Sequence, residues 1–162
     1  MSWSGSVWRM MRKRWISVVA LVAYSAILIR VVVFKAVPVI RIGHLRFRFS
    51  GQHTGEPNLV PFRTLTSYLH GRSGHLIGTV NLVGNIALFV PVGFLASLVY
   101  RRMTRQTALM LAVAVGLATE GMEAVFRVGI FDVDDMILNA LGVMIGYGLF
   151  AIVEGRMRPR LR

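Results

Sequence analysis

The sequence lacks cysteine altogether and is poor in acidic residues and histidine. Its 162 residues include seven Asp and Glu against nineteen Lys and Arg, and only four His. Without cysteine, the chain can form neither a disulfide nor a thiolate metal site. The histidines lie outside the long apolar stretches, and no HExxH, Walker A or GxGxxG motif occurs. The sequence therefore carries no signature of a zinc protease, a P-loop nucleotidase or a Rossmann enzyme.

Apolar residues, in contrast, make up 55% of the chain, and its mean hydropathy is +0.61. A soluble domain of this length would not tolerate so apolar a composition, which is typical of an integral membrane protein. The net charge is +12, but the basic residues mostly flank apolar stretches. Membrane topology and anionic lipid headgroups explain this charge better than nucleic acid does. The expected partner is therefore the lipid bilayer, with no nucleic acid.

Four apolar stretches are each long enough to cross a bilayer as a helix. They lie at about residues 15–37, 80–100, 106–126 and 134–153. The turn between the second and third is short, which predicts a helical hairpin. Pro91 in the second stretch is expected to kink the helix or to free a backbone carbonyl. The expected fold is an all-α integral membrane protein, a four-helix transmembrane bundle with an external loop between spans one and two.

Charged and turn-forming residues divide the chain into five parts. These are a basic N-terminus (1–14), a first transmembrane anchor (15–40), an external loop (41–79), a three-helix core (80–153) and a basic tail (154–162). In the loop, the alternation of apolar and basic residues over 44–50 predicts a short strand or an interfacial ribbon. Residues 58–69 predict a short amphipathic helix on the membrane surface.

The distribution of basic residues predicts the orientation in the membrane. Eleven Lys and Arg lie in the N-terminus, the 101–105 turn and the tail, whereas six lie in the other connections. The positive-inside rule therefore predicts that both termini are cytoplasmic. The basic start also resembles a signal peptide. However, the apolar run continues well beyond the small residues at 23–25, which favours an uncleaved anchor.

With this topology, polar residues gather in the outer halves of spans two to four. In the fourth span, Asp135, Asn139, Gly142 and Gly146 share one helical face. A membrane-centre carboxylate costs about 2.5–3.5 kcal/mol, so a group of them indicates a site rather than packing. The candidate ligand-binding residues are Asn81, Asn85, Glu120, Asp132, Asp134, Asp135 and Asn139. If a divalent cation binds, Asp134 and Asp135 are its expected ligands.

Some of these polar groups also have a structural interpretation. Asn81 and Asn85 fit hydrogen bonds between helices. Glu123 and Arg127 are four residues apart with Glu first, which is the better order for an ion pair on one helix. The spacing of Gly142 and Gly146 predicts that another helix approaches the fourth span closely, although glycine is also simply common in membrane helices.

The aspartates likewise have a structural alternative. Asp132 fits the N-cap of the fourth span, and Asp134 and Asp135 suit the positive end of that helix. Capping accounts for one or two of the three aspartates and does not account for Glu120. Glu120 and Asp135 are therefore the strongest functional candidates.

Four motifs together resemble those of the VanZ-like family, named for an accessory protein of teicoplanin resistance. They are NLVPF at 58–62, NLVGNIALFVPVGF at 81–94, Glu120, and DVDDMILNALGVMIGY at 132–147. The resemblance covers about residues 55–153, with the motifs in order and at familiar spacing. It implies a bacterial cell-membrane protein of the envelope, and it does not define a reaction.

The chain departs from the family pattern at two positions. The family often has Gln where this chain has Glu123, and often has Arg near the position of Gly129, where the nearest here is Arg127. The two departures compensate each other if Glu123 and Arg127 form an ion pair. They leave a polar ligand contact at Glu123 in doubt.

Three functions fit these observations, in decreasing order of preference. The first is a non-enzymatic module that binds a lipid-linked envelope component, a glycopeptide or a partner protein, with a role in glycopeptide tolerance. The second is a metal-dependent enzyme that acts on a phosphate-bearing lipid through Mg²⁺ or Ca²⁺. The third is a proton-coupled transporter, which the placement of the acids on one side and the lack of an inverted repeat disfavour.

Overall fold

The computed structural model describes residues 3–33, 39–42, 45–48, 56–69 and 75–157. Its elements are α1 (Trp3–Val32), β1 (Val39–Ile42), β2 (Leu45–Arg48), α2 (Arg63–Leu69), α3 (His75–Val99), α4 (Arg105–Val125) and α5 (Val133–Met157). Four of them, α1, α3, α4 and α5, are long and apolar enough to cross a membrane. The predicted class, an all-helical membrane protein with four spanning helices, is therefore confirmed.

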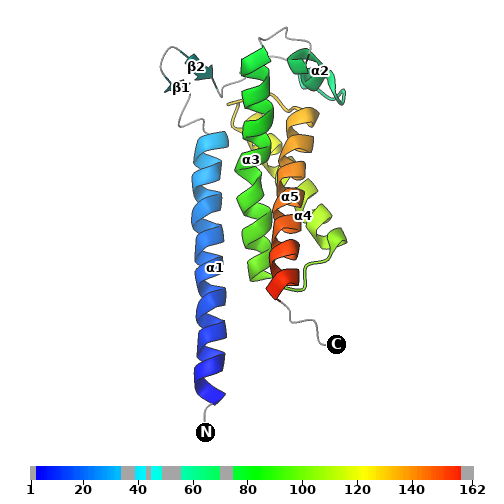
Figure 1. Ribbon diagram of the computed structural model, residues 1–162. Coiled ribbons are helices and arrows are strands. Elements are labelled where there is room, and N and C mark those ends of the chain that lie inside the picture. The colour runs from blue at the N-terminus through cyan, green and yellow to red at the C-terminus, as the bar shows by residue number, and fades with distance from the viewer. Residues whose placement is uncertain (1–2, 34–38, 43–44, 49–55, 70–74, 158–162) are drawn as a thin grey trace.

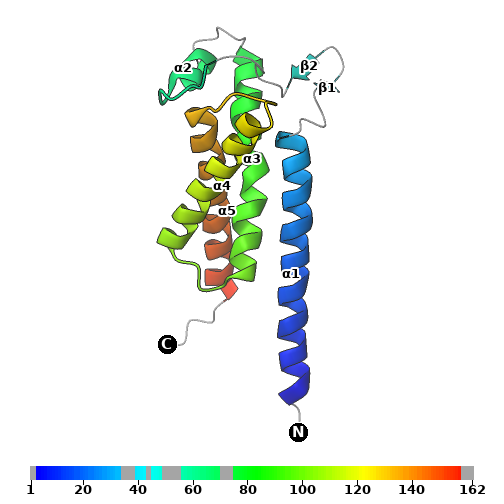
Figure 2. The same cartoon turned by 180° about the vertical axis from the view of Figure 1, so that it is seen from behind.

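The helices stand side by side, with α3 between α1 on one side and the α4–α5 pair on the other (Figures 1 and 2). The two ends of the chain lie at the same end of the bundle, as four crossings require. The β-hairpin and α2 lie at the opposite end, which we call the loop end (Figure 1).

Glycines bring α5 against the backbone of α3. A Cβ added to Gly142 would overlap the Ile86 carbonyl oxygen, and one added to Gly146 would overlap that of Val90. The predicted close approach to the fourth span is thus confirmed, and the partner helix is α3. Without a hydrophobic force between helices in lipid, such backbone contact is a main source of association.

The α4 helix packs on α5 through small residues and is joined to α3 by a short turn, as the sequence predicted. Ala108 and Ala112 are fully buried, and Gly116 lies against Met136 of α5. Thr104 caps the helix, because its side chain accepts a hydrogen bond from the Thr107 N–H and the Thr107 hydroxyl bonds back to the Thr104 N–H. The helical hairpin of spans two and three is therefore confirmed.

The first helix is attached to the bundle mainly through α3. The Tyr24 hydroxyl donates a hydrogen bond of 2.8 Å to the carbonyl oxygen of Leu88. The neighbouring carbonyl, that of Ala87, lacks its usual helical hydrogen bond, because the residue four positions on is Pro91, which has no N–H. The α3 helix nevertheless continues through Pro91. Leu28 adds a buried contact with the core of α3 to α5, while much of the rest of α1 is exposed to the surroundings.

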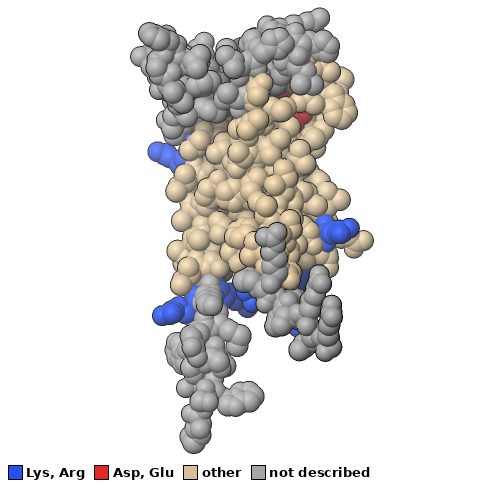
Figure 3. Space-filling model, in the orientation of Figure 1, with Lys and Arg blue, Asp and Glu red and all other residues tan. Residues whose placement is uncertain are grey.

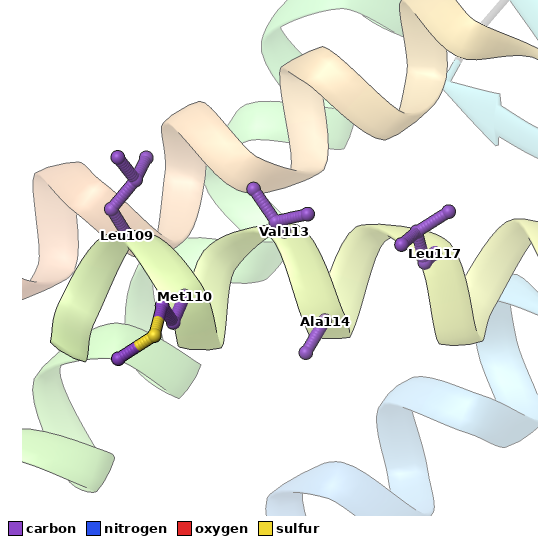
Figure 4. A pocket seen from close by; sticks show the side chains of 5 residues that line it. All are labelled: Leu109, Met110, Val113, Ala114 and Leu117. Carbon is purple, nitrogen blue, oxygen red and sulfur yellow. The ribbon is translucent and has the colours of Figure 1, made fainter. Parts of the chain in front are cut away.

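The surface between the two ends is almost uncharged, and the visible Lys and Arg side chains lie toward the ends (Figure 3). On α4 a shallow apolar hollow is lined by Leu109, Met110, Val113, Ala114 and Leu117 (Figure 4). Exposed apolar side chains in this band are what a lipid-facing surface requires.

Two sequence expectations for the loop are corrected by the structure. Residues 39–40, expected at the end of the first anchor, belong to strand β1, which pairs with β2. The β2 strand confirms the strand expected within 44–50 and pairs antiparallel with β1. The loop helix begins at Arg63 rather than at residue 58, for a reason found at the candidate site.

Candidate functional site

At the loop end, residues 58–65 lie across the start of α5. The Asn58 N–H donates to the Phe131 carbonyl oxygen at 2.9 Å, and the Val133 N–H donates to the Asn58 carbonyl oxygen at 3.0 Å. Asn58 and Asp132 thereby form an isolated parallel bridge. We call Asn58, Thr64, Asp132 and Asp134 the loop clamp, because their side chains fasten this segment.

Asp132 is the centre of the loop clamp. Its Oδ1 accepts hydrogen bonds from Asn58 Nδ2 at 3.0 Å and from the Asp134 N–H at 2.9 Å. Its Oδ2 accepts from the Thr64 hydroxyl at 2.7 Å. The bond from Asp134 is the N-cap bond of α5, so the capping interpretation of Asp132 is confirmed.

Asp134 caps a different helix from the one that carries it. Its carboxylate accepts from the backbone N–H groups of Phe62, Thr64 (2.7 Å) and Leu65 (3.1 Å), at the start of α2. These are the amides that a helix leaves without partners at its N-terminus. Phe62 has a left-handed φ of 67°. The turn at Phe62 and the remote cap explain why α2 begins only at Arg63.

A second group of polar side chains lies between α3, α4 and α5, and we call it the inter-helix set: Asn85, Glu120, Glu123, Asp135 and Asn139. The Asn85 Nδ2 donates to Asp135 Oδ1 at 2.8 Å. Glu120 Oε2 accepts from the Asp132 N–H at 3.1 Å. Glu120 is only 2% exposed, and Asp135, Glu123 and Asp132 all repel a charge on it. The set thus buries several carboxyl groups close to the loop clamp.

Asn139 differs from the other members of this set. Its side chain is 2% exposed, and its Oδ1 atom is buried without a hydrogen-bond donor in the described part of the chain. A buried polar atom without a partner costs about 1–3 kcal/mol. In native structures such an atom is uncommon and requires an explanation, for example a bound group.

Asp134 and Asp135, expected as ligands of one cation, face different parts of the molecule. Asp134 accepts from the amides of α2, whereas Asp135 accepts from Asn85 on α3. Among the described residues, no three His, Cys, Asp or Glu side chains form a group that could hold a metal ion. The two carboxylates thus have different partners, and a metal site here stays a prediction.

For the remaining candidates from the sequence, Asn81 and the pair Glu123 and Arg127, the structure leaves the predicted contacts untested. Asn81 lies in α3, but its side chain falls outside the described residues. The ion pair of Glu123 with Arg127 assumed a continuous helix, whereas α4 ends at Val125 and Arg127 has a φ of 54°. Their helical spacing is therefore lost, and the pairing stays a prediction.

Sequence analysis missed two members of the loop clamp, Asn58 and Thr64. Asn58 was visible only as part of a motif of the resemblance, and Thr64 only as one residue of the amphipathic helix predicted over residues 58–69. Nothing in the local sequence predicts the tertiary contacts of either residue. Both are defined by contacts across about seventy residues of chain, such as Asn58 to Asp132, which are 74 positions apart.

The chain was compared with protein families, curated proteins and solved structures. The model of the VanZ/LLP1 family matches residues 21–154, which is most of the chain and includes α3, α4 and the site. The chain belongs to the VanZ/LLP1 family. The resemblance inferred from the motifs is thereby confirmed, and the VanZ/LLP1 match extends it back into α1. No curated protein and no solved structure matched the chain.

Proposed function

We propose that this VanZ/LLP1 protein is a non-enzymatic module that binds the polar headgroup of a lipid-linked envelope component, such as a cell-wall precursor. In this proposal the headgroup enters from the loop end and contacts the inter-helix set. The protein lies in the bacterial cell membrane with both termini cytoplasmic, as the excess of basic residues on that side predicts.

The observation that carries the proposal is the buried acceptor of Asn139. Packing alone would favour an apolar residue at this position, because an amide with an unpaired oxygen destabilises the bundle. A ligand that donates a hydrogen bond to Oδ1 would offset that cost. Asp135, one turn before Asn139 on the same helix, supplies a further acceptor. Glu120 on α4 supplies another acceptor within the inter-helix set.

The proposal also includes a role in glycopeptide tolerance, which the family name implies. A module that retains a cell-wall precursor would change the access of a glycopeptide to that precursor. In a sensitive bacterium, expression of the protein is expected to raise teicoplanin tolerance, and the Asp135→Asn variant is expected not to. Equal tolerance in both strains, at equal protein levels, would remove this part of the proposal.

Native mass spectrometry in mild detergent tests the binding itself. Wild type would be compared with the double variant Glu120→Gln, Asp135→Asn, which keeps side-chain size but removes two charges. Gly148→Ala is the matched control, because a Cβ added there meets nothing within 4 Å. The expected result is a co-purifying lipid-linked component in wild type and control that is lost in the double variant.

Two other outcomes would change the assignment. If no component is retained by wild type, or if the double variant retains it equally, the proposed binding site is wrong. If a divalent ion co-purifies instead and is lost in the double variant, the alternative of a metal-dependent enzyme acting on a phosphate-bearing lipid gains the support that it now lacks.

A further inference from the structure

The segment directly before α2 exposes four consecutive apolar residues, and we call residues 59–62 the apolar turn. They are Leu59, Val60, Pro61 and Phe62. The side chains of Leu59, Val60 and Phe62 are 66%, 57% and 56% exposed, whereas the preceding Asn58 is buried. Turns at a protein surface are ordinarily polar, and a run of exposed apolar residues in one of them requires a functional explanation.

The apolar turn is fastened on both sides. Before it, the backbone of Asn58 pairs with those of Phe131 and Val133. At its end, the Phe62 N–H donates to the Asp134 carboxylate. Phe62 also has a left-handed φ of 67°, which a bulky residue keeps only where its surroundings enforce it. The loop clamp therefore holds the conformation in which these apolar side chains are exposed.

The same contacts place the apolar turn at the edge of the membrane. Its partners Phe131, Val133 and Asp134 lie at the start of α5, where the apolar span Val133–Gly155 begins. In Figures 1 and 2, α2 and the segment that leads into it lie at the outer edge of the loop end, on the side away from α1. The turn is therefore at the depth where lipid headgroups meet the acyl chains.

The backbone N–H groups of this segment are paired within the chain. From Val60 to Leu65 every N–H donates to Asn58 Oδ1, to the Val60 carbonyl oxygen or to the Asp134 carboxylate. Pro61 has no N–H to pair. A turn in water does not need such complete pairing, because water accepts from free N–H groups, whereas an N–H that faces lipid must find its acceptor within the protein. The pairing therefore favours lipid as the surroundings of the apolar turn.

We propose that the apolar turn inserts its side chains into the lipid leaflet at the loop end and thereby anchors the loop clamp to the membrane. The partner is a lipid surface, contacted at the boundary between headgroups and acyl chains, where interfacial segments bury their apolar side chains. The apolar turn shares no residue with the inter-helix set. The proposal therefore goes beyond the proposed function and does not depend on whether that set binds a headgroup.

Spin labels on single introduced cysteines measure the depth of the turn, and the absence of natural cysteine leaves no background labelling. The whole chain would be reconstituted into vesicles of phosphatidylcholine and phosphatidylglycerol. Collisions of the label with oxygen, which concentrates in lipid, would be compared with collisions with a water-soluble nickel chelate. The label is placed by Val60→Cys, which keeps the fastening hydrogen bonds because Val60 makes them with its backbone. Glu56→Cys is the exposed control outside the spans, and Leu141→Cys is the exposed control within α5.

The expected ratio of oxygen to nickel collisions in Val60→Cys is close to that of Leu141→Cys and well above that of Glu56→Cys. Leu59→Cys is expected to give the same order, which excludes an effect peculiar to one label. If both labels in the turn give the low ratio of Glu56→Cys, the turn faces water and the proposal is wrong. If both collide little with either reagent, protein covers the turn, either a second copy or another chain, and a lipid surface is equally rejected.

Discussion

The loop clamp and the inter-helix set use the same kinds of side chain at neighbouring positions of the chain, and they differ in how completely those side chains are paired. In the loop clamp, Asp132 and Asp134 together accept six hydrogen bonds, from two side chains and four backbone amides. In the inter-helix set, Asp135 and Glu120 each accept one, and Asn139 Oδ1 accepts none within the described residues.

The difference teaches that adjacent carboxylates in one motif need not share a role. Asp134 and Asp135 are neighbours, but successive side chains on a helix point about 100° apart. One therefore reaches the loop and the other reaches α3. Carboxylates whose oxygens already accept several hydrogen bonds stabilise the structure. Buried oxygens that accept few or none indicate that a donor from another molecule is needed. Four predictions test this division, in order of decreasing effect on stability.

Breaking the contact between α3 and α5 should disturb both regions at once. Gly146→Ala would place a methyl group against the Val90 carbonyl and the Phe94 amide of α3. The helices would have to separate, and we expect the free energy of unfolding in mixed micelles to fall by about 2–3 kcal/mol. Gly148→Ala is the control, with no expected loss. Equal stability of the two variants would show that the close approach is not needed.

Removing the remote cap should affect the loop clamp alone. Asp134→Ala leaves three amides at and just before the start of α2 without their acceptor. We expect a loss of about 2 kcal/mol in the free energy of unfolding, together with faster trypsin cleavage after Arg63. Asp134→Asn retains one carbonyl oxygen and should give a smaller effect. A large loss of lipid retention in Asp134→Ala, alongside the loss of loop stability, would mean that the loop clamp and the inter-helix set do not act independently.

The hydrogen bond that attaches α1 should contribute less to the free energy of unfolding than the α3–α5 contact or the loop clamp. Tyr24→Phe removes the hydrogen bond to the Leu88 carbonyl, and hydrogen bonds between membrane helices average about 0.6 kcal/mol. We expect a loss of that size in the free energy of unfolding. Tyr100→Phe, at an exposed residue beyond α3, is the control. A loss of several kcal/mol would mean that α1 is an integral part of the core.

The sharpest contrast is expected at Asn139. Asn139→Leu removes the unpaired acceptor, so the free energy of unfolding should change by less than about 1 kcal/mol or even increase, unlike that of Asp134→Ala. Thermal unfolding of the ligand-free protein measures it. A loss comparable to that of Asp134→Ala would assign Asn139 a structural hydrogen bond and would remove the observation on which the proposed site rests.

Much of the fold could be predicted from the sequence because it depends on local properties. Hydrophobic length alone located the four spans, although α3 begins at His75 rather than near residue 80 and α1 ends at Val32 rather than 37. Helix ends are less predictable because capping contacts decide them. The spacing of Gly142 and Gly146 also predicted a close helix contact, but not which helix makes it.

The sequence by itself determined the membrane class, the number of spanning helices, the motifs of the family and the list of polar residues that have to be explained. Those features follow from composition and from periodicity along one helix. Only the tertiary structure decided that Asp134 caps α2, that Asp135 meets Asn85, and that Asn139 lacks a donor among the described residues. These depend on contacts between segments far apart in the chain, and helix spacing carries no information about a partner on another helix.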